Sequence, residues 1–150
     1  MDRALELAHE SLFVTSPNPR VGCVLADPDG RVIGAGRTQQ AGGAHAEVMA
    51  LKDAQANGFA TLGATAYVTL EPCPMCAGAI VNSRLDRVVY GCDDPKAGAA
   101  RSLFHLIDSD SLNHAAVITA GVRAEAVLGC DIFDRAHGNL LLKCNSFMSL

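Results

Sequence analysis

The chain has 150 residues, of which 49% are hydrophobic, with a formal net charge of -4 and a pI of about 5.6. This length suits one domain with a single core. The acidic balance excludes the basic coat of a general nucleic-acid binder, although it leaves room for a local basic patch. The N-terminal segment is charged and amphipathic, without the apolar core of a signal peptide, and no stretch has the apolar length of a membrane span. We therefore expect a cytoplasmic protein without a membrane partner, whose six cysteines stay reduced and serve a metal or a catalytic site.

The predicted elements alternate between helices and strands after an initial hairpin. Residues 3–13 place Leu5, Ala8, Leu12 and Phe13 on one apolar helical face, and the Ser-Pro-Asn-Pro that follows breaks the helix. The later elements, in chain order, are strands at 21–26 and 31–36 around an Asp-Pro-Asp-Gly turn, a loop at 38–44, a helix at 45–58, a strand at 64–70, a helix at 74–83, a strand at 86–92, a loop entering a short helix at 93–103, a strand at 115–119 and a helix at 122–136.

This order predicts an α/β fold with three layers, α/β/α: a mixed, mostly parallel five-stranded sheet with helices on both faces. No repeat or linker interrupts the chain. We expect one domain over residues 1–135, followed by a C-terminal tail of unknown role at 136–150.

Two cysteines, Cys73 and Cys76, lie three positions apart where an apolar strand gives way to a helix. At positions i and i+3 of a helix they share a face. The unpaired N–H groups and the partial positive charge of a helix start stabilise thiolates. Taken alone, the pair fits a thioredoxin-like redox site, half of a structural zinc knuckle, or two ligands of a catalytic metal.

A histidine and a glutamate earlier in the chain favour the catalytic metal. A closed structural zinc site needs four protein ligands, and the other four cysteines stand singly. A catalytic site needs three ligands and an open position, and His45 can complete the set with Cys73 and Cys76. His45-x-Glu47 followed by Pro-Cys-x-x-Cys is the signature of zinc nucleobase deaminases. We therefore expect one Zn²⁺ per chain, bound by these three residues.

The carboxylate beside the histidine suits the proton transfers of hydrolytic deamination. Zinc lowers the pKa of bound water toward about 7. One carboxylate near that water can then accept its proton, protonate a ring nitrogen and assist the departure of ammonia. Glu47 is the predicted catalytic residue because it is not needed as a ligand. Glu71 is the other candidate, and we interpret it as a turn or helix-entry residue that helps to orient the cysteine loop.

The chain resembles two branches of the cytidine-deaminase-like zinc superfamily. Over about residues 65–125 it resembles bacterial tRNA adenosine deaminase, TadA, in the segments 69–84, 87–91, 94–103 and 112–114. Over about residues 3–72 it is similar to the deaminase domain of RibD of the riboflavin pathway, in the segments 3–8, 15–25, 41–51 and 63–73. The two resemblances share the zinc residues, and they imply the superfamily's fold and a hydrolytic deaminase.

The residues around the motif bear on the substrate. RibD-like domains usually carry a longer insert between the two cysteines, whereas two residues separate them here. TadA usually has an Asn where this chain has Thr38, while Asn18 offers another amide for a base edge or serves as a turn residue. Arg84, Lys96 and Arg101 are candidates for phosphate contacts, or solvated surface charges. The predicted substrate-binding residues are Asn18, Thr38, Arg84 and Lys96.

We expect a zinc-dependent deaminase of adenosine in tRNA or another single-stranded nucleic-acid loop, where the bases are already unstacked. The alternatives are a deaminase of a small molecule, either the diaminopyrimidine of the riboflavin pathway or guanine or cytosine, and a zinc-stabilised binding module, which would not need Glu47. The resemblance to TadA also implies a homodimer, to which the apolar, small-residue segments 77–85 and 97–104 would contribute.

Overall fold

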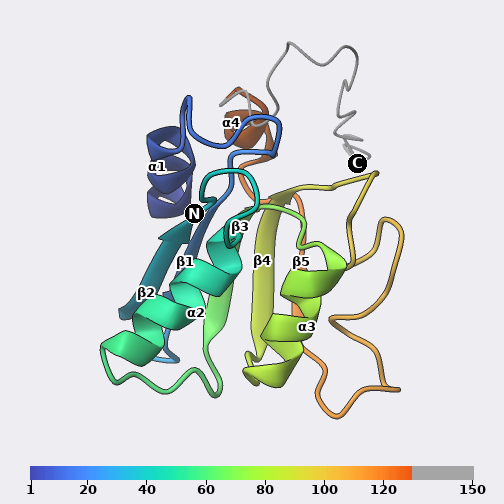
Figure 1. The fold of residues 1–150 in the computed structure, drawn as a ribbon. Coiled ribbons are helices and arrows are strands. Elements are labelled where there is room, and N and C mark those ends of the chain that lie inside the picture. The colour runs from blue at the N-terminus through green and yellow to red at the C-terminus, as the bar shows by residue number, and fades with distance from the viewer. Residues whose placement is uncertain (130–150) are drawn as a thin grey trace.

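The computed structural model describes residues 1–129, and the predicted domain boundary at residue 135 and the segment 136–150 lie outside this range. Five strands form one sheet in the order β2-β1-β3-β4-β5 (Figure 1). The elements are α1 (Asp2–Glu10), β1 (Gly22–Ala26), β2 (Val32–Arg37), α2 (Ala46–Ala56), β3 (Thr65–Leu70), α3 (Pro74–Asn82), β4 (Arg87–Cys92), β5 (Val117–Thr119) and α4 (Ala124–Gly129).

The predicted mixed five-stranded sheet is confirmed, but its parallel pairs do not predominate. β1 runs antiparallel to both of its neighbours, β2 and β3, whereas β3, β4 and β5 are parallel. The hairpin reverses the chain before α2 carries it across the sheet, so β3 returns alongside β1 in the opposite direction. The carboxyl ends of β2, β3 and β4 and the start of β1 therefore meet at one edge of the sheet.

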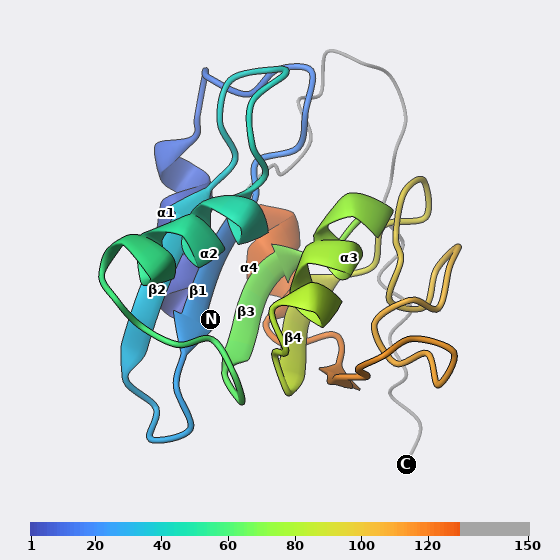
Figure 2. The ribbon, with the colours of Figure 1, turned by 60° about the horizontal axis from the view of Figure 1, so that its bottom comes forward.

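Helices cover both faces of the sheet, as predicted. α2 and α3 lie on one face, and α1 and α4 lie on the other (Figures 1 and 2). Two glycines allow close packing: a Cβ on Gly22 would lie 1.9 Å from the Ala4 carbonyl oxygen of α1, and one on Gly36 would lie 2.3 Å from the Ala46 carbonyl oxygen of α2. These contacts fix where each helix begins relative to the sheet edge. No helix within residues 1–129 is both long and apolar enough to cross a membrane.

The first helix is shorter than predicted. α1 ends at Glu10, and of the four residues assigned to its apolar face only the first two are buried. Leu12 is 42% exposed and Phe13 is 94% exposed. The helix stops because the chain turns at Ser11, whose hydroxyl donates to the Thr38 carbonyl oxygen at 3.1 Å. This tertiary bond overrides the helical pattern of the sequence.

The short helix predicted within 93–103 is absent from that segment, which forms consecutive turns. Its N–H groups at Ala100, Arg101 and Ser102 donate to the carboxylate of Glu71 rather than to carbonyl oxygens one helical turn earlier. The last predicted helix is described only as far as Gly129, and its remainder, residues 130–136, lies outside the described range.

Candidate active site and metal centre

Two helix N-termini bring the predicted zinc ligands together. His45 is the residue that caps α2, Cys73 caps α3, and Cys76 lies in the first turn of α3. Both capping residues have extended backbones, with φ/ψ of -74°/163° at His45 and -73°/170° at Cys73. Pro74 occupies the first turn of α3, where its lack of an N–H costs no hydrogen bond. The partial positive charge of both helix starts therefore faces the same point.

The distances within this group fit a zinc ion. The His45 Nδ1 atom lies 3.5 Å from the Sγ atom of Cys73 and 3.5 Å from that of Cys76. The three donor atoms all lie within 4.8 Å of one another. Zinc bonds of about 2.3 Å to sulfur and about 2.0–2.1 Å to nitrogen, at a tetrahedral angle, separate the two atoms by about 3.6 Å. One imidazole and two thiolates are also a donor set that zinc prefers.

The charges of the group are arranged for a cation. A hydrogen bond from the Cys76 thiol lowers the pKa of Cys73 to about 4, and a hydrogen bond from His45 makes a smaller contribution in the same direction. The same bond with Cys73, together with burial, raises the pKa of Cys76, and the bond to Cys73 raises the pKa of His45. A divalent cation can take the place of the protons on His45 and Cys76. None of the four cysteines within residues 1–129 forms a disulfide.

The carboxyl group of Glu47 lies next to the three donor atoms but is not one of them. The residue is in the first turn of α2, two positions after His45, and is 4% exposed. Burial raises the pKa of Glu47. A carboxyl group with a raised pKa, placed beside a metal site, is suited to accept a proton and return it near neutral pH.

A cavity of about 300 Å³ opens over this group, within the size range of small-molecule sites. Its walls come from the sheet edge where β2, β3 and β4 end, from the segment before β1 and from the start of α2. His45, Glu47 and Cys73 line it, together with three of the predicted substrate-binding residues, namely Asn18, Thr38 and Lys96. The fold thus brings residues from five separate segments to one hollow.

The three cavity residues differ in what their side chains can do. The Thr38 hydroxyl is already engaged: it accepts from the Val21 N–H at 3.1 Å and donates to the Val21 carbonyl oxygen at 3.4 Å. Asn18 is half-buried in a turn closed by its own N–H, which donates to the Thr15 carbonyl oxygen at 2.7 Å. Lys96 is exposed at the rim. Asn18 and Lys96 are therefore the two that present a polar group to a ligand.

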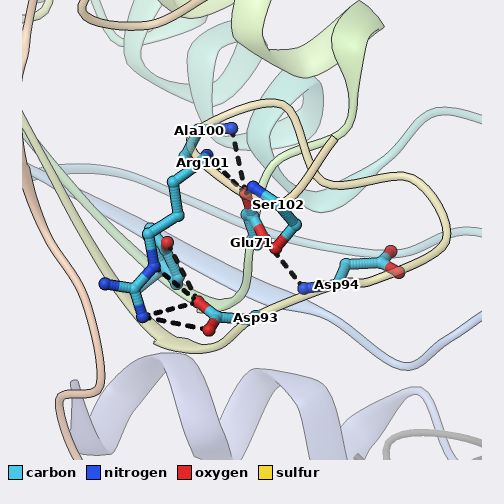
Figure 3. A network of polar contacts seen from close by, with 7 residues as sticks. Glu71, Asp93, Asp94, Ala100, Arg101 and Ser102 are labelled. Carbon is cyan, nitrogen blue, oxygen red and sulfur yellow. Dashed lines mark hydrogen bonds and ion pairs between the residues drawn. The ribbon is translucent and has the colours of Figure 1, made fainter. Parts of the chain in front are cut away.

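The other two predicted basic contacts lie elsewhere. Arg84 follows α3, does not line the cavity, and donates a hydrogen bond to the Asn113 carbonyl oxygen. The Arg101 guanidinium binds both carboxylate oxygens of Asp93, at 3.0 Å each, and lies 5.9 Å from the centroid of the Tyr90 ring (Figure 3). Both side chains are thus held by neighbouring groups on the surface.

Two acidic residues of the cavity wall were not predicted as site residues. Glu71 and Asp94 both line the cavity and are 2% and 6% exposed. The Glu71 carboxylate holds residues 94–102, whereas the sequence interpretation had it orienting the cysteine loop. Asp94 accepts hydrogen bonds from the Lys96 and Ala97 N–H groups. The signal in the sequence was an acidic residue one or two positions after the end of each of two buried strands.

Comparisons with known proteins agree with this geometry. The family model of the cytidine and deoxycytidylate deaminase zinc-binding region matches residues 1–92. The chain is 46% identical to a tRNA-specific adenosine deaminase of Haemophilus influenzae over 70% of its length and 64% of the relative's. It is 47% identical to the riboflavin biosynthesis protein RibD of Escherichia coli over 71% of its length and 30% of that protein's.

A solved structure from a study of A-to-I editing by tRNA:A34 deaminases matches with a TM-score of 0.71 and 33% identity, covering 87% of this chain and 96% of that one. The chain spans less than two thirds of the length of the two sequence relatives. The similarity to both deaminase branches, expected from the sequence, is confirmed. The chain belongs to the family of the cytidine and deoxycytidylate deaminase zinc-binding region.

Proposed function

We propose that this protein is a zinc-dependent hydrolytic deaminase that converts adenosine to inosine in tRNA. One observation carries the reaction type: His45, Cys73 and Cys76 converge at zinc-binding distances, and the buried carboxyl group of Glu47 lies beside them in a cavity of small-molecule size. A binding module held together by zinc has no use for that buried carboxyl group. The tRNA-specific relative and the matching tRNA deaminase structure support the substrate class.

The chain's own residues account for the steps of the reaction. His45, Cys73 and Cys76 would hold a zinc ion, which would lower the pKa of a water molecule in the cavity toward neutrality. Glu47 would accept a proton from the water as its oxygen bonds to C6 of the adenine base, and would pass this proton to the neighbouring ring nitrogen. It would then take the proton of the new C6 hydroxyl group and deliver it to the amino group, which leaves as ammonia while the C6 carbonyl forms. The raised pKa of Glu47 helps because the protonated form must be accessible in each cycle. One water is consumed and one ammonia is released.

The cavity rim suits a nucleotide within an RNA loop. Asn18 offers an amide toward a base edge, and the exposed Lys96 offers a positive charge for a phosphate. An anticodon loop exposes its bases, so little free energy is spent on unstacking the target. Only two residues separate the cysteines, so the wall beside Cys73 carries no insert that would bring basic groups to a small phosphorylated substrate.

The riboflavin-pathway diaminopyrimidine is the second candidate substrate. The 47% identity to RibD favours it, as does Thr38 in place of the TadA-type Asn. A panel decides between the two: zinc-loaded protein is incubated with an RNA hairpin carrying an unpaired loop adenosine, with the phosphoribosyl diaminopyrimidine, and with free guanine and cytosine. We expect inosine from the hairpin and the fastest ammonia release with it. Ammonia from the diaminopyrimidine and none from the hairpin would assign the enzyme to the riboflavin pathway.

The assembly and location belong to the same proposal. We propose a cytoplasmic homodimer with one zinc ion per chain. Because the net charge is -4, RNA affinity would come from a few local contacts. Each phosphate contact on a single strand contributes about 0.7 to the slope of the logarithm of affinity against the logarithm of salt concentration, so the expected slope is shallow.

A further inference from the structure

A buried carboxylate next to the cavity binds both ends of one loop. Glu71 lies directly after β3 and is 2% exposed. Its Oε1 atom accepts the N–H groups of Ala100 at 3.1 Å, Arg101 at 2.8 Å and Ser102 at 2.9 Å. Its Oε2 atom accepts the Asp94 N–H at 2.8 Å and the Ser102 hydroxyl (Figure 3). Both ends of residues 94–102 are therefore attached to one side chain.

The hydrogen bonds to Glu71 take the place of the backbone hydrogen bonds that a helix or strand would give the loop. A buried charge is costly unless hydrogen bonds compensate it, and bonds to a carboxylate are stronger than neutral ones. Glu71 has no ion-pair partner among residues 1–129, since the nearby Arg101 pairs with Asp93. The backbone N–H groups of the loop are thus what compensates the charge, and the charge is what fixes the loop.

The loop also fits closely around this carboxylate. A Cβ on Gly98 would lie 2.2 Å from the Glu71 Oε2 atom and 2.6 Å from the Asp94 carbonyl oxygen. The Gly98 N–H donates to that carbonyl oxygen at 2.8 Å, and the Ala99 N–H donates to the Pro72 carbonyl oxygen at 2.8 Å. The loop therefore fits in one position only, which is set by the Glu71 carboxylate and by Pro72, just before Cys73.

The same loop forms a wall of the cavity. Asp94, Lys96 and Ala97 line it, and the Asp94 carboxylate holds the Lys96 and Ala97 N–H groups at 2.9 Å and 3.2 Å. A chain of hydrogen bonds thus runs from Glu71 through the Asp94 backbone to the residues that face a ligand. We infer that Glu71 is a positioning residue, which holds residues 94–102 as the substrate-facing wall and so sets substrate affinity. The kinetic part of this inference rests on the proposed deaminase function.

The test compares three variants of the zinc-loaded full chain. Glu71→Gln keeps the side chain's shape but replaces one acceptor oxygen by an NH2 group. Two hydrogen-bond donors then face each other where the wild type has a hydrogen bond. Ser102→Ala removes only the hydroxyl bond. Asp53→Asn is the matched control, because that carboxylate accepts the Ala35 N–H at 2.9 Å in a contact between α2 and β2 outside the cavity lining. Amide hydrogen exchange, zinc content, kcat and KM are measured for each.

For Glu71→Gln we expect amide exchange at residues 94–102 to accelerate by at least about tenfold and KM to rise by about ten- to hundredfold, as for a lost charge-assisted hydrogen bond. Zinc content and exchange in α2 should stay at the wild-type level, and kcat should change by less than about threefold. Ser102→Ala should shift the same quantities less. Asp53→Asn should leave exchange at 94–102 and KM unchanged.

Zinc loss in Glu71→Gln, or faster exchange throughout the chain, would show that Glu71 supports the whole fold and would overturn the inference. Faster exchange at 94–102 with an unchanged KM would equally overturn it, because the loop would not be a substrate wall. If Glu71→Gln fails to fold, Ser102→Ala is judged by the same two measurements, amide exchange at residues 94–102 and KM. A wild type without activity on any panel substrate would overturn the proposed function alone. The affinity of wild type and variants for the RNA hairpin would then be measured in place of KM.

Discussion

Glu47 is buried beside three metal-binding donor atoms but is not one of them. Glu47→Gln keeps the shape of the side chain but cannot accept a proton. We expect zinc content and melting temperature near the wild-type values and a loss of kcat of about 10⁴-fold, the upper end for general acid–base catalysis, because one group serves several transfers. Elemental analysis and ammonia release measure this. Activity within a few-fold of wild type would refute the role of Glu47 as the base.

The two thiols at the start of α3, those of Cys73 and Cys76, are predicted to be ligands, and a third thiol provides a matched control. Cys76→Ala should lose most of the zinc and much of the stability, because metal binding is coupled to folding. Cys23→Ala removes a thiol that is also fully buried but is not part of the donor group, so it should keep its zinc. Zinc per chain after dialysis is the measurement. Full zinc content in both Cys73→Ala and Cys76→Ala would refute the site.

The sequence predicted which residues come together where local spacing decides it, and it missed the residues that distant contacts place at the cavity. The zinc motif fixes two helix starts, and the fold then brings them together. The placement of Arg84 could not be predicted, since its partner Asn113 lies 29 positions along the chain. The partners of Glu71 lie 23 to 31 positions away, so its role as the anchor of a loop left no periodic signal.

At the scale of elements, the packing of α2 against β2 positions both His45 and Glu47. A Cβ on Gly36 would lie 2.3 Å from the Ala46 carbonyl oxygen and 2.4 Å from the Ala50 backbone nitrogen. Gly36→Ala should therefore push α2 outward, lower the free energy of unfolding by about 1–3 kcal/mol, and weaken zinc binding because the helix start moves. Denaturant unfolding and competitive zinc titration measure the two effects.

Gly30→Ala is the control for that prediction. Gly30 has a φ of 84° in the hairpin turn, and a Cβ at this position would meet no atom within 4 Å, so alanine is strained there without touching α2. We expect a loss of stability of about 1–2 kcal/mol from the left-handed backbone alone and unchanged zinc affinity. Equal zinc affinities in Gly36→Ala and Gly30→Ala would show that the packing of α2 against β2 does not position the metal ligands.

The pattern of elements was predictable where local periodicity decides the structure. The hairpin, the strands that follow and the two helices of the zinc motif all form close to their expected ranges. The pattern failed at 93–103, where the carboxylate of Glu71 takes N–H groups that a helix would use. It failed again after Glu10, where Leu12 and Phe13 fit an apolar helical face but the chain turns toward β2.

At the scale of the whole molecule, the sheet edge that holds the site lies near a surface with exposed apolar side chains. α3 and the segment that follows β4 run beside each other in both views (Figures 1 and 2). Met75 of α3 is 55% exposed, and Leu103 and Phe104 of the neighbouring segment are 51% and 49% exposed. Exposed apolar side chains on two neighbouring segments often mark a protein interface, which supports the proposed homodimer.

That interface gives the final prediction. Light scattering at about micromolar concentration should give the mass of a dimer, and replacing both Leu103 and Phe104 by Ser should give a monomer, because burying the two side chains contributes about 1.5–3 kcal/mol each. Phe13→Ser makes the same kind of change at a side chain that is 94% exposed in the segment after α1, and it should leave the dimer intact. A monomeric wild type would remove the dimer from the proposal. Dissociation by Phe13→Ser alone would place the interface at the segment after α1.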